Sequence, residues 1–114
     1  MSFKTVNSVN LPGDRYKSAV KENTANIRTT KGRLLNIKAS NLSTTTDLYL
    51  QIHDKATPVQ AGDIPVLPIF VGRNGYADLT DIRCELGIQV ALSTTPDTYT
   101  APGVASGWFY AESK

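Results

Sequence analysis

Apolar and polar residues alternate along much of this chain, and the alternation is clear between residues 47 and 54. A period of two places successive side chains on opposite faces, which is typical of a strand with one buried face. We therefore predict a strand over residues 48–53 that buries one set of side chains and exposes the other. The buried set is Leu48, Leu50 and Ile52, and the exposed set is Tyr49, Gln51 and His53.

The longest alternation covers residues 82–92, where every second residue is apolar. A helix cannot keep residues two apart on one face over such a length, whereas a strand does so automatically. The pattern predicts one long strand with Cys84 in its buried row as a small core side chain. Gly87 interrupts the outer row and indicates a bulge or a close approach by another backbone. The apolar row is Ile82, Cys84, Leu86, Ile88, Val90 and Leu92.

Five shorter segments have weaker strand patterns, at residues 20–29, 33–41, 64–71, 76–79 and 107–112. Pro65 and Pro68 cannot donate to a ladder, so the 64–71 strand is predicted to be bulged or at a sheet edge. Residues 43–46 form a short polar connection and predict one hairpin. Residues 72–75 predict a second hairpin, because the Asn and Gly residues there tolerate positive φ. In the last strand, Trp108 and Tyr110 share one face, and Phe109 and Ala111 share the other.

Seven strands and no helix predict an all-β fold, an antiparallel β-sandwich of the immunoglobulin-like or jelly-roll-like kind. Leu50, Ile52, Val90 and Leu92 are expected to be buried and to meet across the two sheets. Residues 1–19 lack any periodic pattern and are predicted to form an extended N-terminal arm, which leaves 20–114 as a single β-sandwich domain. The long loop over residues 94–106 is of the kind that mediates contacts, with Tyr99 as its anchor.

Charge is divided unevenly along the chain. Residues 1–38 carry eight basic and two acidic side chains, and residues 39–114 carry four basic and eight acidic ones. Such a division can steer a partner or favour head-to-tail contacts between copies, although scattered solvated charges give the same count. The basic residues are not interleaved with aromatic ones, so nucleic acid is not an expected partner. No apolar run approaches the ~20 residues that cross a bilayer, so no membrane contact is expected either.

Candidate catalytic and metal-binding residues are few. The single Cys84 excludes an intrachain disulfide and any Cys-rich zinc site. His53 and Cys84 are predicted to face opposite ways, and no G-x-S-x-G elbow is present, so a nucleophile–base pair is not expected. Two carboxylate pairs could share Ca²⁺, but turn-forming Asp is the commoner explanation. These pairs are Asp54 with Asp63 and Asp78 with Asp81. We therefore expect no enzyme, no catalytic or metal site and no cofactor.

Several stretches taken in order resemble a group of small tailed-bacteriophage virion structural proteins, the β-sandwich decoration or cement-like proteins. In that group a strand ending in LHD or LFD precedes a P…G…PVL loop and strand, followed by an ALS-T-P-TYT stretch and an aromatic last strand. The similarity covers residues 32–112 and leaves the first thirty residues outside. The stretches here are GRLL at 32–35, NLS at 41–43, YLQIHDKATPVQAGDIPVLPIFV at 49–71, GIQVALSTTPDTYTAPG at 87–103 and WFYAE at 108–112.

The resemblance implies a structural component of a phage particle, located in the virion and made in the host bacterial cytoplasm. We expect a capsid decoration protein that stabilises the head, self-associates as a homotrimer and docks on the major capsid protein. A tail, neck or fibre component is the alternative within the particle. A receptor- or carbohydrate-binding module on the same fold is the alternative from another class, and it would use the exposed aromatics Tyr49, Tyr99 and Trp108.

Overall fold

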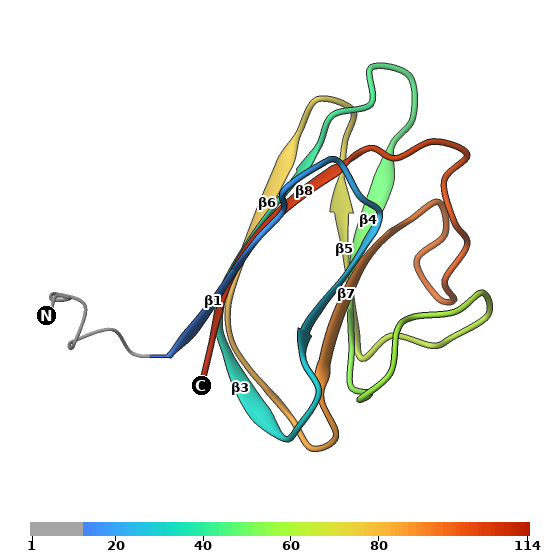
Figure 1. Cartoon of the computed structure of the whole chain (residues 1–114). Helices are drawn as coiled ribbons and strands as arrows, with labels where there is room; N and C mark the ends of the chain where they lie inside the picture. Colours follow the sequence, from blue (N-terminus) through green and yellow to red (C-terminus); the bar gives the residue numbers. More distant parts are fainter. Residues whose placement is uncertain (1–12) are drawn as a thin grey trace, which may run out of the picture.

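Two four-stranded antiparallel sheets pack face to face in the computed structural model, which describes residues 13–114 (Figure 1). The predicted all-β sandwich is therefore confirmed. Sheet A has the strand order β1-β8-β3-β6, and sheet B has the order β2-β7-β4-β5. The strands are β1 (Asp14–Lys17), β2 (Thr24–Arg28), β3 (Gly32–Asn41), β4 (Leu48–His53), β5 (Leu67–Val71), β6 (Tyr76–Cys84), β7 (Ile88–Ser93) and β8 (Gly107–Ser113).

The strand order identifies the sandwich as a jelly roll. The paired strands are β1 with β8, β2 with β7, β3 with β6 and β4 with β5. This is the pairing of one long antiparallel hairpin, folded at the β4–β5 connection and then wound so that successive pairs alternate between the two sheets. The winding decides between the two sandwich types that the sequence left open, because a double-sheet roll of eight strands is the jelly-roll arrangement.

Apolar side chains from both sheets fill the space between them. Leu50, Ile52, Val90 and Leu92 are all buried, as predicted. They do not meet across the sheets, however: β4 and β7 are neighbours in sheet B, and Leu50 lies opposite Leu92 there. From sheet A, the core receives Leu34, Ile37, Ala39, Phe109 and Ala111. The prediction for the last strand is confirmed, because Phe109 and Ala111 face this core.

The apolar row over residues 82–92 belongs to two strands rather than one. β6 ends at Cys84 in sheet A and β7 begins at Ile88 in sheet B, so the chain changes sheet between them. Leu86, predicted to be inward, is 61% exposed at this bend. The expected close approach at Gly87 is confirmed, because a Cβ there would lie 2.5 Å from the carbonyl oxygen of Lys55. An alternating pattern cannot show where the chain passes from one sheet to the other if every second residue stays apolar through the bend.

The segment over residues 1–19, predicted to be an extended arm, contains β1. This strand is the one that the sequence pattern did not predict, and it raises the number of strands from seven to eight. β1 pairs along its length with β8, with Tyr16 opposite Ala111. Tyr16 packs on the core and its hydroxyl donates to the carboxylate of Glu22, which also accepts from Ser18 Oγ at 2.7 Å. Burial and the Glu22 carboxylate raise the pKa of Tyr16 to about 12. The rest of the predicted arm, residues 1–12, lies outside the described residues.

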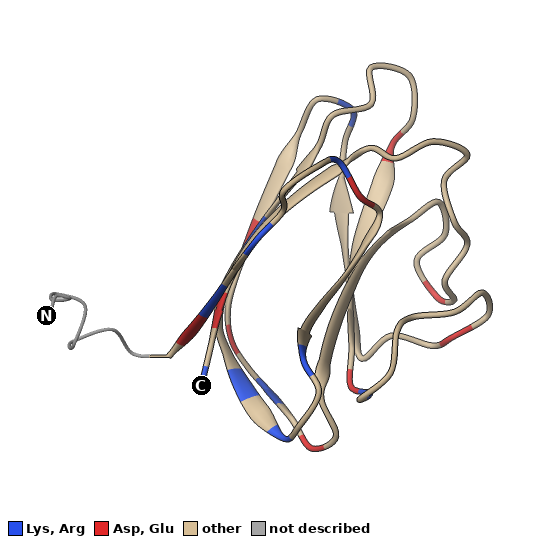
Figure 2. Ribbon diagram, viewed as in Figure 1, with Lys and Arg blue, Asp and Glu red and all other residues tan. Residues whose placement is uncertain are grey.

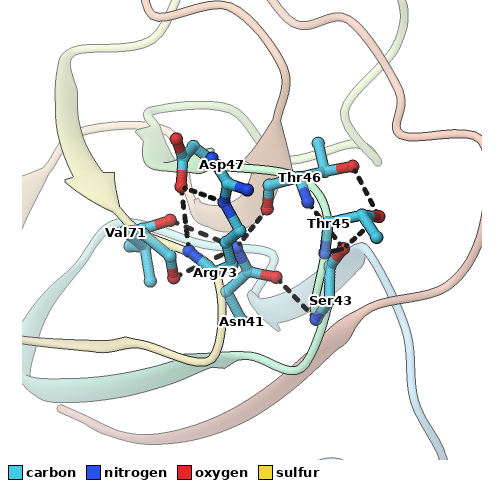
Figure 3. Close-up of polar contacts among 8 residues, drawn as sticks. Asn41, Ser43, Thr45, Thr46, Asp47, Val71 and Arg73 are labelled. Atoms are coloured by element: carbon cyan, nitrogen blue, oxygen red, sulfur yellow. Dashed lines mark hydrogen bonds and ion pairs between the residues drawn. The ribbon is translucent and has the colours of Figure 1, made fainter.

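Both turn segments connect the two sheets, so the predicted hairpins at 43–46 and 72–75 are wrong. The second does turn tightly, with the Gly75 amide donating to the Gly72 carbonyl at 2.8 Å and Asn74 at a φ of 55°. Buried Asn41 ties the two connections together (Figure 3). Its Nδ2 donates to the carbonyls of Thr46 and Val71 at 2.9 and 3.2 Å. This end of the sandwich is thus cross-linked by hydrogen bonds.

β5 is an edge strand of sheet B, as the prolines predicted. Pro68 lies opposite Gln51 of β4, and an edge position tolerates its missing donor. Prolines on an edge also hinder the addition of another strand. Among residues 13–114 there is no helix of the length and hydropathy that spanning a membrane requires.

Candidate functional site

Cys84 lies in the core between the two sheets, whereas His53 lies outside the core on sheet B. Cys84 faces the core from β6, where burial, with smaller contributions from Asp54 and Glu85, raises the pKa of its thiol to about 11. His53 lies on the outer face of sheet B, as predicted, but it is buried there, so its expected exposure is wrong. The two side chains share no cleft, and a thiol with so high a pKa is a poor nucleophile at neutral pH.

The Asp residues considered as Ca²⁺ ligands make other contacts. Asp54 accepts from the backbone amides of Glu85 and Leu86 at 3.0 and 2.8 Å. Burial by itself would raise the pKa of Asp54, but the backbone amides that donate to it together lower that pKa. Asp63 is paired with Lys55 at 2.5 Å. Asp78 pairs with Lys38 at 3.1 Å and Asp81 with Arg33 at 2.6 Å. In the part of the chain that the structure describes, no three His, Cys, Asp or Glu side chains are grouped as metal ligands.

Two long loops, over residues 54–66 and 94–106, cover the outer face of sheet B, and a buried amide holds the second of them there. Gln51 Nε2 donates to the carbonyls of Thr95, Pro96 and Thr98 at 2.9–3.1 Å. Since that nitrogen donates, Gln51 Oε1 is the acceptor toward His53 Nε2 at 2.9 Å, and the His53 proton therefore resides on Nε2. Burial lowers the pKa of His53, with nearby Asp63 opposing the shift. His53 is thus a neutral structural donor.

Tyr99 joins these two loops to each other. Its backbone amide donates to the Asp63 carbonyl at 2.8 Å, and its carbonyl accepts from Gly62 at 2.9 Å. The side chain is buried, so the anchoring role predicted for it is confirmed. Buried Ser93 adds a further fixed point, because its Oγ accepts from the amides of Thr95 and Thr100. Hydrogen bonds therefore join the two loops to each other and to sheet B.

A row of apolar side chains projects to solvent beside these loops, along β5 and the segment before it. We call it the 64–70 row. Its members are Ile64, Val66, Pro68 and Phe70, all of which are exposed. The exposed fraction is 77% for Ile64, 57% for Val66 and 58% for Phe70. Pro68 and Phe70 are two apart in β5 and share its solvent face, and Ile64 and Val66 are exposed in the segment just before the strand, while Leu67, Ile69 and Val71 point toward the core. The ring of Tyr49 packs edge-on against Phe70, with 5.7 Å between centroids. The row contains no charged side chain.

A second surface, on the outer face of sheet A, combines aromatic and basic side chains. We call it the aromatic patch and define it as Lys17, Lys38, Ser40, Trp108 and Tyr110, which together with Phe109 line a hollow of about 280 Å³. The strand order brings them together. β8 lies between β1 and β3, so Tyr110 has Lys17 on one side and Lys38 on the other. Trp108, two residues along β8, lies beside Ser40.

The three aromatics proposed for a carbohydrate surface do not meet. Tyr49 lies on the outer face of sheet B, Tyr99 is buried in the loops and Trp108 lies on the outer face of sheet A. Trp108 instead has Tyr110 as its aromatic neighbour. The sequence did show these two on one face, but it gave no strand order. The adjacency of Lys17 and Lys38 to them was therefore missed, as was the loop clamp at Gln51.

The charged side chains are concentrated on sheet A (Figure 2). β4, β5 and β7 contain no charged residue and β2 contains only Arg28, so nearly all charged residues that lie in strands belong to sheet A. Many of these are paired, such as Arg15 with Glu112 at 3.2 Å and Lys38 with Asp78. Sheet A combines β1 and β3 from the basic part of the sequence with β6 and β8 from the acidic part, so the division of charge along the sequence is not kept as two separate surfaces.

Comparison with known proteins gives no match, whether to protein-family models, to curated proteins or to solved structures. The resemblance to the tailed-phage virion proteins therefore stays a prediction.

Proposed function

We propose that this chain is a phage virion structural protein, a capsid decoration protein that self-associates and docks on the major capsid protein. The observation that carries the proposal is the exposed apolar 64–70 row on a jelly-roll sandwich. Jelly rolls recur in viral capsid proteins, in lectins and in cupins. Fold alone does not establish function, whereas an exposed apolar surface indicates a contact with a partner.

The 64–70 row has the properties of a protein contact. Soluble monomers rarely present contiguous apolar surface, and such surface marks interaction sites. Phe70, Ile64 and Val66 are each more than half exposed, and their neighbours in the row are also apolar. Aromatic and aliphatic anchors of this kind supply much of the binding free energy in protein interfaces. Because Pro68 hinders strand addition, the partner is expected to pack on the side chains rather than to extend sheet B.

The two loops beside the row support the same function. Gln51, Ser93 and Tyr99 hold them rigidly, so little conformational entropy is lost when a partner binds. A decoration protein needs a pre-formed surface that many identical copies present alike. The space between the sheets is filled with apolar side chains from both of them, so the surface is the part of the fold that is available for binding.

The proposal is tested by adding purified protein to phage particles from which the gene has been deleted. Wild-type protein should sediment with the particles and raise the temperature at which the heads release DNA. Phe70→Asp should weaken the attachment at least about tenfold, because a charge replaces an apolar anchor. Tyr76→Asp is the matched control, since Tyr76 is an exposed aromatic on sheet A.

Circular dichroism melts confirm that both variants are folded before binding is compared. Equal binding by Phe70→Asp and wild type would show that the 64–70 row is not the docking surface. Absence of wild-type binding to heads, tails and fibres alike would refute the virion proposal. Binding to tails or fibres only would replace the decoration role with the alternative position in the particle.

A further inference from the structure

We propose that the aromatic patch on sheet A is a binding site for an acidic saccharide, that is, a sugar chain carrying carboxylate groups. This site is separate from the 64–70 row and does not rest on the virion proposal. The inference begins from the arrangement of side chains around the hollow of about 280 Å³. That size is close to the lower limit of small-ligand pockets, which are mostly apolar with a few placed polar groups.

The floor of the site is a pair of aromatic rings on one strand. Trp108 and Tyr110 are two residues apart on β8, which separates them by about 7 Å along the strand. Trp108 is 36% exposed, so one part of the indole is fixed and the rest is open to a ligand. A pyranose ring has one face made of C–H groups, and that face is apolar enough to pack on an aromatic ring. Two rings at this spacing suit two successive sugar units.

The rim of the site supplies donors for charged and hydroxyl groups. Lys17 and Lys38 flank Tyr110 on neighbouring strands, so their Cα atoms lie about 10 Å apart. Lys38 is neutralised by Asp78, whereas Lys17 has no ion-pair partner within residues 13–114. Ser40 is opposite Trp108 and adds a hydroxyl. A carboxylate on the sugar would meet Lys17, which is the charge complementarity that selects an acidic saccharide over a neutral one.

Two other occupants fit the site less well. A single-stranded nucleic acid would need a basic groove that follows its phosphates. Here Glu112 and Asp78 are paired with Arg15 and Lys38 on the same face, so Lys17 can meet a single carboxylate but no row of unpaired basic side chains is present in the patch to follow successive phosphates. A second copy of the chain finds a more exposed apolar surface at the 64–70 row, where Ile64 is 77% exposed against 36% for Trp108. A second copy bound over Trp108 would have to supply hydrogen-bond partners for the polar side chains around it, whereas the hydroxyl groups of a saccharide supply such partners readily.

Trp108 makes the test direct, because it is the only tryptophan in the chain. The full-length protein is screened against an array of acidic and neutral glycans and then titrated, by tryptophan fluorescence, with oligogalacturonate, neutral galacto-oligosaccharide of equal length and oligodeoxythymidylate. We expect the acidic sugar to change the emission saturably and to bind about tenfold more tightly than the neutral one.

Matched variants locate the binding. Lys17→Ala should weaken acidic-sugar binding about tenfold, through loss of one charge-assisted contact. Arg83→Ala, which removes an exposed base of the same sheet outside the patch, should change it less than about twofold. Trp108→Ala should abolish binding measured by calorimetry while leaving the melting curve in place, because Trp108 packs outside the core.

Four results would overturn the proposal. The first is that no acidic glycan on the array binds. The second is that Lys17→Ala and Arg83→Ala weaken binding equally. The third is that oligodeoxythymidylate binds more tightly than the sugar. The fourth is that Trp108 emission shifts on dilution and Trp108→Ala abolishes self-association, which would make the patch a contact between copies.

Discussion

Removing the Gln51 amide should release the loop over residues 94–100 and destabilise the whole sandwich. Gln51 is fully buried, and its Nε2 is within 3.1 Å of three loop carbonyls. An amide nitrogen carries only two hydrogens, so it makes about two full hydrogen bonds to the loop. Its oxygen accepts a third from His53. These three bonds are lost together in Gln51→Ala.

The expected loss follows from the usual net value of a buried hydrogen bond, about 1 kcal/mol. Three such bonds give a loss of about 3 kcal/mol in the free energy of unfolding. Gln51→Glu has nearly the same size but no amide donor, and it directs an acid at three carbonyl oxygens. Its loss should be at least as large as that of Gln51→Ala. Gln60→Ala, at an exposed glutamine of the neighbouring loop, is the control and should change stability by less than about 0.5 kcal/mol.

Urea denaturation measures the free energy, and amide hydrogen exchange reports on the loop itself. In both Gln51 variants the amides of Thr95 and Thr100, which donate to Ser93 Oγ, should exchange faster than in wild type. If Gln51→Glu is within about 0.5 kcal/mol of wild type with unchanged exchange, the amide does not clamp the loop and the reasoning fails.

Three further predictions follow from buried groups. Leu50→Ala should lower the free energy of unfolding by ~2–5 kcal/mol through lost burial and a cavity, and a loss under about 1 kcal/mol in urea melts would contradict the core assignment. Cys84 should react with a thiol reagent only after unfolding, because it is buried and its pKa is raised to about 11; rapid labelling of the native protein would refute this. His53 has a pKa below its usual 6.5 when folded, so the unfolded chain binds the extra proton and stability should fall as pH drops below about 6.5. Melts between pH 7 and 4.5 check this, and His53→Gln should remove that part of the slope; an equal slope in the variant would assign it to other groups.

The fold class could be predicted from the sequence because a period of two is a local property. Leu50 and Ile52 showed one buried face within a few residues, and Pro68 marked the edge strand. The strand order is not local. Nothing in the alternation through Cys84 and Ile88 tells a reader that the chain crosses from one sheet to the other.

The burial of polar side chains was hidden for the same reason. Gln51 and His53 lie on the face that alternation assigns to solvent, and only the loops, which come from distant parts of the chain, cover them. β1 was missed because Tyr16 is its only residue that faces the core, too little to produce a period. The aromatic patch likewise needed β1, β8 and β3 side by side before Lys17 and Lys38 could be placed next to Tyr110.

The proposal that this chain is a virion decoration protein is tested most directly by counting it in purified particles. Density-purified phage carrying the gene are digested, and peptides of this chain and of the major capsid protein are quantified by mass spectrometry against labelled standards. The account predicts many copies per particle, in a fixed whole-number ratio to the major capsid protein, recovered with isolated heads after tails are removed. Absence of the chain from the particles, with abundant protein left in the lysate, would contradict it.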